Sequence, residues 1–497
     1  MPIWVGDPEV SYDSTDVLKR LPSVTGVMKG EGEETFAELT RLYEEKRADE
    51  RSLAGIKGIT FRKDNGEIAE NEWRMPMDLS KVPFVYEDMA EFEHKIIYYE
   101  TSRGCPFSCS YCLSSIDKCL RFRNLELVKK ELQFFIDHEV PQVKFVDRTF
   151  NCKHSHSMAI WTYLKEHDRG KTNFHFEVAV DLLNEEEMEL IASMRPGLIQ
   201  LEIGIQSTNP ETITEIRRKM NFEEVKRIVK RVQEKGNVHQ HLDLIAGLPY
   251  EDYDSFRRSF ADVYALRPQQ LQLGFLKVLR GSFMHEHTEE YDCHYQEREP
   301  YEVLYTKWLP YDDVLKLKDV EEMVEVYYNS GQFVHTLPMI ERLYENPFDF
   351  FQELGDFYRA KGYSEAAHNR IQRYEILLEF LQDEKQQDEA FFRQMMVLDL
   401  YARENMKTRP RFAKDPSEWK NESRDFYQKE AETRMLLPSY TTYDWKQLQR
   451  MTHVEVFDYD VLGNGEKARM VLLFDYQKRD PLTGNAEMID CSELFYA

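Results

Sequence analysis

The sequence lacks any apolar run long enough to cross a membrane. A spanning helix needs about 20 consecutive apolar residues, and no stretch of this chain of 497 residues approaches that length. The first ten residues, MPIWVGDPEV, also lack the basic start and the apolar core of a secretory signal peptide. We therefore expect a cytoplasmic protein with no membrane partner.

Positive charge is also in deficit. The chain has 65 Lys and Arg residues against 90 Asp and Glu residues, which gives a formal net charge of −25. A protein that follows a nucleic-acid backbone needs an extended basic surface. The charge balance therefore disfavours nucleic acid as a partner.

Cysteine is scarce, but it is not scattered. Only seven cysteines occur, too few for a disulfide framework in a chain of this size, yet Cys105, Cys109 and Cys112 fall within the segment GCPFSCSYC. Three thiolates in one loop are soft ligands for zinc or for iron–sulfur iron. If Cys119 does not coordinate, the site has three protein ligands and one open position, as working metal centres do. The alternative is a structural zinc site completed by Cys119 or by a histidine.

The chain divides into four parts by pattern. Residues 1–48 read as a fragment of a Rossmann-like α/β domain, because they hold too few strands for a complete one. Residues 49–94 are irregular, with a hairpin turn at 63–66, and are interpreted as a linker. Residues 95–300 repeat a strand-plus-helix pattern, and residues 301–497 are mainly helical, with a terminal β-hairpin.

Six strand-like runs in the third part predict a partial parallel (β/α)6 barrel of the TIM type. They lie at 96–100, 143–147, 174–180, 198–205, 239–246 and 271–278, each followed by a segment of helical period. The fold class is therefore α/β.

Polar residues alternate with apolar ones along these strands. In LEIGIQS, the residues Glu202, Gly204 and Gln206 share one face of the strand, and the apolar residues share the other. The inward-facing polar set predicted in the same way from the other strands is His175, Glu177, Asp181, His241, Asp243, Gln270 and Gln272. An ordinary barrel fills its lumen with branched apolar side chains. This pattern therefore predicts a cavity for a polar ligand.

The motif CxxxCxxC, with an aromatic residue before its last cysteine and placed after the first barrel strand, resembles the radical S-adenosylmethionine (SAM) superfamily. The similarity is greatest to the branch that unites cobalamin-dependent members with oxygen-independent coproporphyrinogen dehydrogenase-like enzymes. The resemblance implies a 4Fe-4S cluster on Cys105, Cys109 and Cys112, with S-adenosylmethionine on the open iron. It further implies reductive cleavage of SAM to a 5′-deoxyadenosyl radical, which abstracts hydrogen from a small-molecule substrate. The electron donor would be a protein such as flavodoxin or ferredoxin.

The resemblance also implies a set of cofactor-binding residues. Carried over by motif, they are Tyr99 for the sulfonium, Tyr111 for the adenine, Glu177 for the amino or ribose groups, Gln206 and Asp243 for ribose or methionine, Arg218 for the carboxylate, and Asp147 in place of a glycine-rich turn. No catalytic residue is assigned beyond the cluster ligands.

The N-terminal segments GDPEVSYD and KGEGEETF resemble the last two turns of a cobalamin-binding domain. The first strands of such a domain are not found, so we interpret the segment as truncated. The resemblance implies descent from a cobalamin-dependent enzyme, and a bound cobalamin would favour methyl transfer or rearrangement. The alternatives are a generic α/β fragment here and, for the whole chain, a non-catalytic zinc- or cluster-binding module or a truncated, inactive relative.

Overall fold

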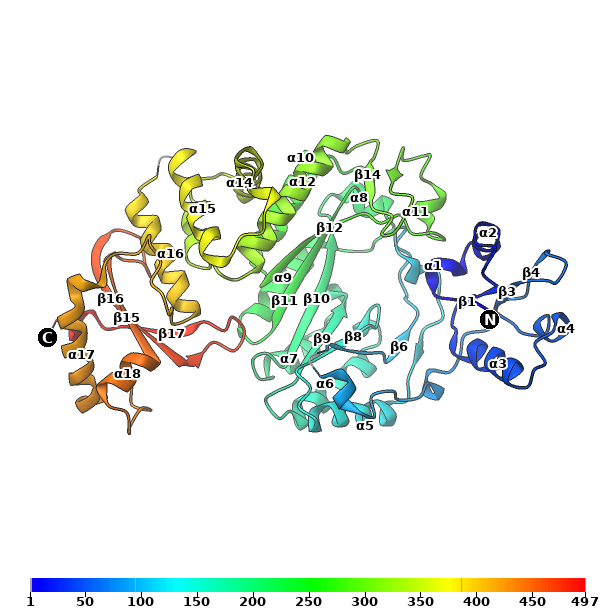
Figure 1. Cartoon of the computed structure of the whole chain (residues 1–497), viewed down its shortest axis with the longest axis horizontal. Coiled ribbons are helices and arrows are strands. Elements are labelled where there is room, and N and C mark those ends of the chain that lie inside the picture. The colour runs from blue at the N-terminus through cyan, green and yellow to red at the C-terminus, as the bar shows by residue number, and fades with distance from the viewer. Residues whose placement is uncertain (1, 94, 386, 497) are drawn as a thin grey trace. The chain divides into compact units, whose positions relative to one another are not determined.

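The computed structural model describes residues 2–93, 95–385 and 387–496 (Figure 1). It divides the chain into two compact units. The first comprises the described residues of 1–259 and 274–314, and the second those of 260–273 and 315–497. Within the described residues, none of the helices combines the length and the apolarity that a membrane crossing requires.

A six-stranded sheet has its strands in the order in which they occur in the chain. Its strands from β5 to β11 form the centre of the first unit. The four pairings from β5 to β11 are parallel. The predicted partial (β/α)6 barrel is confirmed. The strands are β5 (Ile97–Tyr99), β8 (Gln142–Phe145), β9 (Asn173–Val178), β10 (Ile199–Gln206), β11 (His239–Ala246) and β12 (Gln270–Phe275).

Alternating burial along β10 explains how the sheet separates a core from a lumen. Leu201, Ile203 and Ile205 are at most 2% exposed, whereas Glu202 and Gln206 on the other face are partly accessible. The apolar face is covered by helices that contact one another in sequence, α5 with α6, α6 with α7, and α7 with α9. The helices of this region are α5 (Leu125–Asp137), α6 (His154–His167), α7 (Glu185–Ala192), α8 (Pro210–Glu215), α9 (Phe222–Gln233) and α10 (Tyr253–Tyr264).

These helices carry local start signals and one apolar stripe. Asn184 and Glu187 form a reciprocal capping box at the start of α7. In α9 the buried residues are Val225, Ile228, Val229 and Val232, the spacing of one helix face.

A separate four-stranded sheet, in the order β1-β2-β3-β4, precedes the barrel. The first pair is parallel and the other two are antiparallel. Strands β3 and β4 lie in the stretch predicted as a linker, where the buried Ile59 and Phe61 join them to this sheet. The predicted turn at 63–66 is confirmed, since it connects these two strands. The elements are β1 (Trp4–Val5), α1 (Pro8–Ser11), α2 (Ser14–Arg20), β2 (Gly26–Met28), α3 (Glu33–Glu44), α4 (Glu50–Leu53), β3 (Ile59–Arg62) and β4 (Ile68–Glu70).

The second unit is mainly helical, as predicted. Its sheet has three antiparallel strands, β15 (Thr452–Tyr459), β16 (Lys467–Arg479) and β17 (Ala486–Asp490), where the sequence predicts two. The long helix α16 is buried along most of its length. The chain from 311 onward forms α12 (Tyr311–Met323), α13 (Thr336–Glu341), α14 (Pro347–Lys361), α15 (Arg370–Asp383), α16 (Glu389–Arg403), α17 (Lys420–Thr433), α18 (Trp445–Met451) and α19 (Ser492–Phe495).

Candidate functional site

The three-cysteine loop leaves the sheet after β5 and is closed at its base. Strand β6 (Ser102–Arg103) pairs antiparallel with β7 (Arg121–Phe122). Between them, the amide of Cys105 donates to the carbonyl of Asp117 at 3.1 Å. Gly104 has φ of +86°, and a Cβ there would lie 2.6 Å from the carbonyl oxygen of Cys119. Only glycine fits this crossing without strain.

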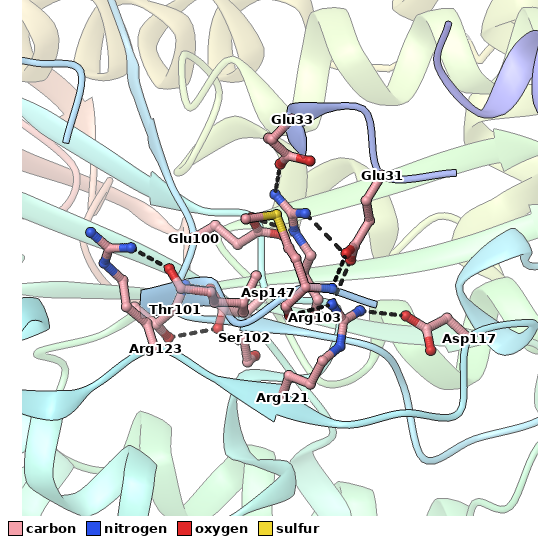
Figure 2. Close-up of polar contacts among 12 residues, drawn as sticks. Glu31, Glu33, Glu100, Thr101, Ser102, Arg103, Asp117, Arg121, Arg123 and Asp147 are labelled. Carbon is pink, nitrogen blue, oxygen red and sulfur yellow. Dashed lines mark hydrogen bonds and ion pairs between the residues drawn. The ribbon is translucent and has the colours of Figure 1, made fainter. Parts of the chain in front are cut away.

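Asp147, just beyond β8, anchors the strand end that leads into the loop. Its carboxylate is fully buried and accepts hydrogen bonds from the Thr101 amide at 3.0 Å, the Thr101 hydroxyl at 2.6 Å and the Ser102 hydroxyl at 2.5 Å (Figure 2). Burial raises the pKa of Asp147 to about 6, against the lowering effect of these hydrogen bonds. Asp147 is not among the residues that line the cavity described next, so the structure gives it an anchoring role.

A cavity of about 200 Å³ lies at the carboxyl ends of the barrel strands. The structure brings eight of the predicted residues together on its walls: Cys105, Cys109, Cys112, Tyr111, Glu177, Gln206, Arg218 and Asp243. These residues come from the loop, from β9, β10 and β11, and from the segment after α8.

Tyr99 is not brought to this cavity. It lies on the apolar side of β5, where its ring contacts Phe135 and Phe145 edge-on and its hydroxyl donates to Glu131. Because side chains alternate along a strand, it is the neighbour Tyr98 that takes the opposite, more exposed side.

Several polar atoms around the cavity lack partners within the described residues. They include the Gln206 side-chain oxygen and Arg218 Nε. Buried polar atoms without partners are costly unless a ligand satisfies them. Gln206 is held over the cavity by a backbone φ of +75° at a register shift in β10. A Cβ at Gly204 would lie 2.2 Å from the Gln206 side-chain nitrogen. The Gln206 side chain can therefore take this conformation only beside a glycine.

Charges in the cavity are strongly coupled. Burial and the neighbouring Glu202 raise the pKa of Glu177 to about 7. Burial also raises the pKa of the Cys109 thiol, and the Arg218 guanidinium, whose Nη1 is 3.9 Å from Cys109 Sγ, opposes this rise. The contacts of Glu202 act the other way: burial would raise its pKa, but His175 and Lys144 lower it to about 2. The cavity therefore offers a cation, a fully ionised carboxylate and a carboxyl that titrates near neutrality.

The cysteine geometry suits a group larger than a single ion. Four sulfurs about 2.3 Å from one zinc would lie about 3.8 Å apart. Among the described residues, the one set of three ligand-type side chains with all ligand atoms within 4.8 Å of one another is His175, Glu202 and His241, and not the three cysteines. Cys119 is exposed and does not line the cavity. Cys119 is therefore not placed to complete a zinc site with the other three cysteines.

Ion pairs connect the loop to the N-terminal sheet. Arg103 contacts Glu33 at 2.6 Å, Glu100 at 2.9 Å and Glu31 at 3.3 Å, and Arg121 contacts Glu31 at 2.6 Å (Figure 2). Glu31 and Glu33 belong to the turn formed by residues 30–33, GEGE, within the segment KGEGEETF. The turn that resembles a cobalamin-domain motif is therefore fixed directly against the cysteine loop.

A second cavity of about 650 Å³ lies between that turn and the loop. Both N-terminal turns line it, with Gly6, Asp7, Pro8, Gly30, Glu31, Gly32 and Glu33. Ser114 and Arg148 line this cavity and the smaller one alike. The sequence singles out neither residue for such a position.

Comparison with known proteins gives this geometry a family. The family model described as the Radical SAM superfamily matches residues 99–263, the range that contains the loop and most of the cavity walls. Residues 99–263 form a radical SAM domain. After it, residues 289–474 match a family described as a protein of unknown function, DUF4080. The resemblance stated from the sequence is confirmed.

Relatives of the radical SAM domain include methyltransferases. The chain is 26% identical over 260 residues to an uncharacterized methyltransferase of Pyrococcus horikoshii, covering 50% of this chain and 54% of that protein. It is 26% identical over 275 residues to the cobalamin-dependent radical SAM methyltransferase TokK of Streptomyces tokunonensis, covering 51% and 39%. The chain thus spans about half the length, or less, of these curated relatives.

A solved structure supports the fold. The cobalamin-dependent S-adenosylmethionine radical enzyme OxsB superposes with a TM-score of 0.52 at 15% identity, covering 80% of this chain and 66% of that one. At this identity the similarity concerns the fold of the radical SAM domain and its neighbours.

Proposed function

We propose that the protein is a radical SAM enzyme that binds a 4Fe-4S cluster through Cys105, Cys109 and Cys112 and cleaves S-adenosylmethionine reductively. The reaction would serve hydrogen abstraction from a small-molecule substrate, with electrons from a donor such as flavodoxin or ferredoxin. The observation that carries the proposal is one cavity whose walls hold the three cysteines together with Asp243 and the unpartnered polar atoms of Gln206 and Arg218.

The chain's own residues supply binding and orientation. Arg218 offers a guanidinium edge to a carboxylate, and the carboxyl of Glu177 lies on the same cavity as a partner for an ammonium group. Tyr111 adds a ring surface, and Gln206 and Asp243 add hydrogen-bond acceptors. When bound, the cluster and S-adenosylmethionine supply the radical chemistry, while the narrow cavity excludes water from it.

Anaerobic reconstitution tests this proposal. We expect about four irons per chain and an absorbance band at about 400 nm. When dithionite and S-adenosylmethionine are added, the protein should produce 5′-deoxyadenosine. The variant Cys109→Ala should lose the product, whereas Cys119→Ala, outside the cavity, should keep it. One tightly bound zinc with no 5′-deoxyadenosine, or full activity in Cys109→Ala, would contradict the proposal.

A second candidate function is cobalamin-linked methyl transfer, which the second cavity favours. Both turns that resemble a cobalamin domain line it, and it adjoins the cysteine cavity at Ser114 and Arg148. None of its lining residues is a histidine, so these residues offer no imidazole to cobalt. Contacts to a corrin would come from the turn backbones and from small side chains.

Binding of hydroxocobalamin to the full chain, measured by equilibrium dialysis, tests this candidate. Gly32 has an ordinary backbone conformation, and no heavy atom lies within 4 Å of the position that a Cβ would take there. Gly32→Trp should therefore fill the cavity without strain and abolish binding. Gly55→Trp, in the same part of the chain but outside the cavity, is the control. Failure of the unmodified chain to retain hydroxocobalamin would contradict the candidate.

A further inference from the structure

Below the cavity, two histidines and a glutamate converge from three neighbouring strands. His175 is on β9, Glu202 on β10 and His241 on β11, and their ligand atoms all lie within 4.8 Å of one another. The strand register explains the meeting, because Glu202 is paired with His241 and the residue two before it, Gln200, with His175. All three side chains are on the lumen face.

The two imidazoles are buried, and each has a carboxylate neighbour at ion-pair distance. Each histidine is 6% exposed. His175 Nε2 is 2.9 Å from a Glu202 oxygen and His241 Nε2 is 3.0 Å from an Asp243 oxygen, but neither contact has hydrogen-bond geometry. Within the described residues both nitrogens therefore lack a hydrogen-bond partner. The observation that points to a shared ion is the convergence of the three ligand atoms, which all lie within 4.8 Å of one another.

We propose that His175, Glu202 and His241 bind a divalent transition-metal ion beneath the cavity. Two imidazoles and one carboxylate form a ligand set typical of zinc and of non-haem iron(II) sites, and it leaves coordination positions open. Glu202 also lines the cavity, which gives the ion a route to this position. The site is distinct from the cysteine loop, and it does not depend on the proposed SAM chemistry.

The neighbouring charges define what the ion must displace. The Lys144 ammonium is 2.9 Å from Glu202 and is partly exposed, so it can leave toward solvent when a cation arrives. Asp243, beside His241, adds a second carboxylate. The alternative is that His175, Glu202 and His241 belong only to a structural network of ion pairs. In that case Lys144 would supply the positive charge, and no metal would be needed.

Zinc binding to the full-length chain tests the proposal. In a background with Cys105→Ser, Cys109→Ser and Cys112→Ser, equilibrium dialysis against Zn²⁺ should retain about one ion per chain at this site. His175→Ala together with His241→Ala should remove it, or weaken it by at least about 100-fold. His239→Ala is the matched control, because His239 lies on β11 two residues before His241 but outside the converging set.

Two further measurements keep the test decisive if the serine background folds poorly. When the cysteines are intact, the double histidine variant should bind about one zinc ion fewer per chain than the unmodified chain. Zinc bound by the cysteines is present in both proteins, so it does not affect the difference. Lys144→Met should tighten zinc binding by about tenfold, because it removes a competing cation. A folded protein that retains no zinc beyond the cysteines, an unchanged zinc count in the double histidine variant, or weaker binding in Lys144→Met would overturn the proposal.

Discussion

At the scale of single residues, Glu177 should make S-adenosylmethionine binding dependent on pH. Its pKa of about 7 leaves the carboxyl mainly neutral below that pH and mainly ionised above it. If the carboxylate binds the ammonium group of the cofactor, the dissociation constant should rise about tenfold as the pH falls from about 8 to about 6. Anaerobic calorimetry on the reconstituted protein would measure it.

The matched variant is Glu177→Gln, which keeps the shape of the side chain but cannot titrate. It should bind more weakly at high pH and show a flat profile. A profile in Glu177→Gln that equals that of the unmodified protein would show that another group is responsible.

Arg218 should contribute affinity by a different route. Burial lowers the pKa of Arg218, but its neighbours Tyr111, Cys109 and Asp181 outweigh that effect and raise it, so the guanidinium stays charged at any working pH. Arg218→Met should weaken S-adenosylmethionine binding by about 10- to 100-fold, the range for loss of a charge-assisted contact. Arg217→Met, which removes an exposed neighbour, is the control. Loss of bound iron to the same extent in both variants would assign the effect to the loop and not to the cofactor.

The positions of site residues could be predicted from the sequence where a motif and a strand face agreed. Glu177, Gln206 and Asp243 satisfied both conditions, and all three line the cavity. The prediction for Tyr99 rested on the motif alone. The alternation of side chains in the short strand β5 turns Tyr99 toward the helices. Asp147 comes to the right end of its strand, but the Thr101 and Ser102 hydrogen bonds saturate its carboxylate. Such contacts depend on which loop packs beside the strand, and strand periodicity does not specify that.

At the scale of elements, the cysteine loop depends on the backbone of Gly104. An alanine there would combine a left-handed backbone with a contact of 2.6 Å to a carbonyl oxygen. Gly104→Ala should lower the free energy of unfolding by about 2 kcal/mol or more, and it should reduce the iron retained. Thermal melting of the apoprotein and iron analysis after reconstitution would measure both effects.

Gly170→Ala supplies the control for this effect. Gly170 has φ of +77°, but a Cβ added there would have no heavy atom within 4 Å. It should show only the conformational cost, about 1 kcal/mol, with normal iron content. Equal losses of stability and iron in the two variants would contradict a specific role for the crossing at Cys119.

Elements were predictable from the sequence when they were long and regular. The six barrel strands repeat a clear alternation, and the helices that follow have marked starts. Strands β3 and β4 are short. Strand β3 pairs antiparallel with β2, and β4 pairs with β3, so the place of both in the sheet depends on the contact of β3 with the more distant β2. The His175–Glu202–His241 set shows the same limit. Its shared face was predictable, but its convergence depends on the register between strands.

At the scale of the whole molecule, the two compact units should unfold separately. Units of this size usually behave as cooperative blocks. Scanning calorimetry should therefore resolve two transitions in the reconstituted protein. S-adenosylmethionine at about 100 times its dissociation constant should stabilise the unit that holds the cavity by about 2.7 kcal/mol and leave the other transition unchanged. A single transition, or an equal shift of both, would contradict this expectation.

The shared wall of the two cavities has a consequence for the lifetime of reactive species. Ser114 and Arg148 line both cavities, so the two cavities adjoin along these side chains. A short-lived species generated on one side would have almost no diffusion path before it met its target on the other. A larger side chain at position 114 would therefore change the space on both sides at once.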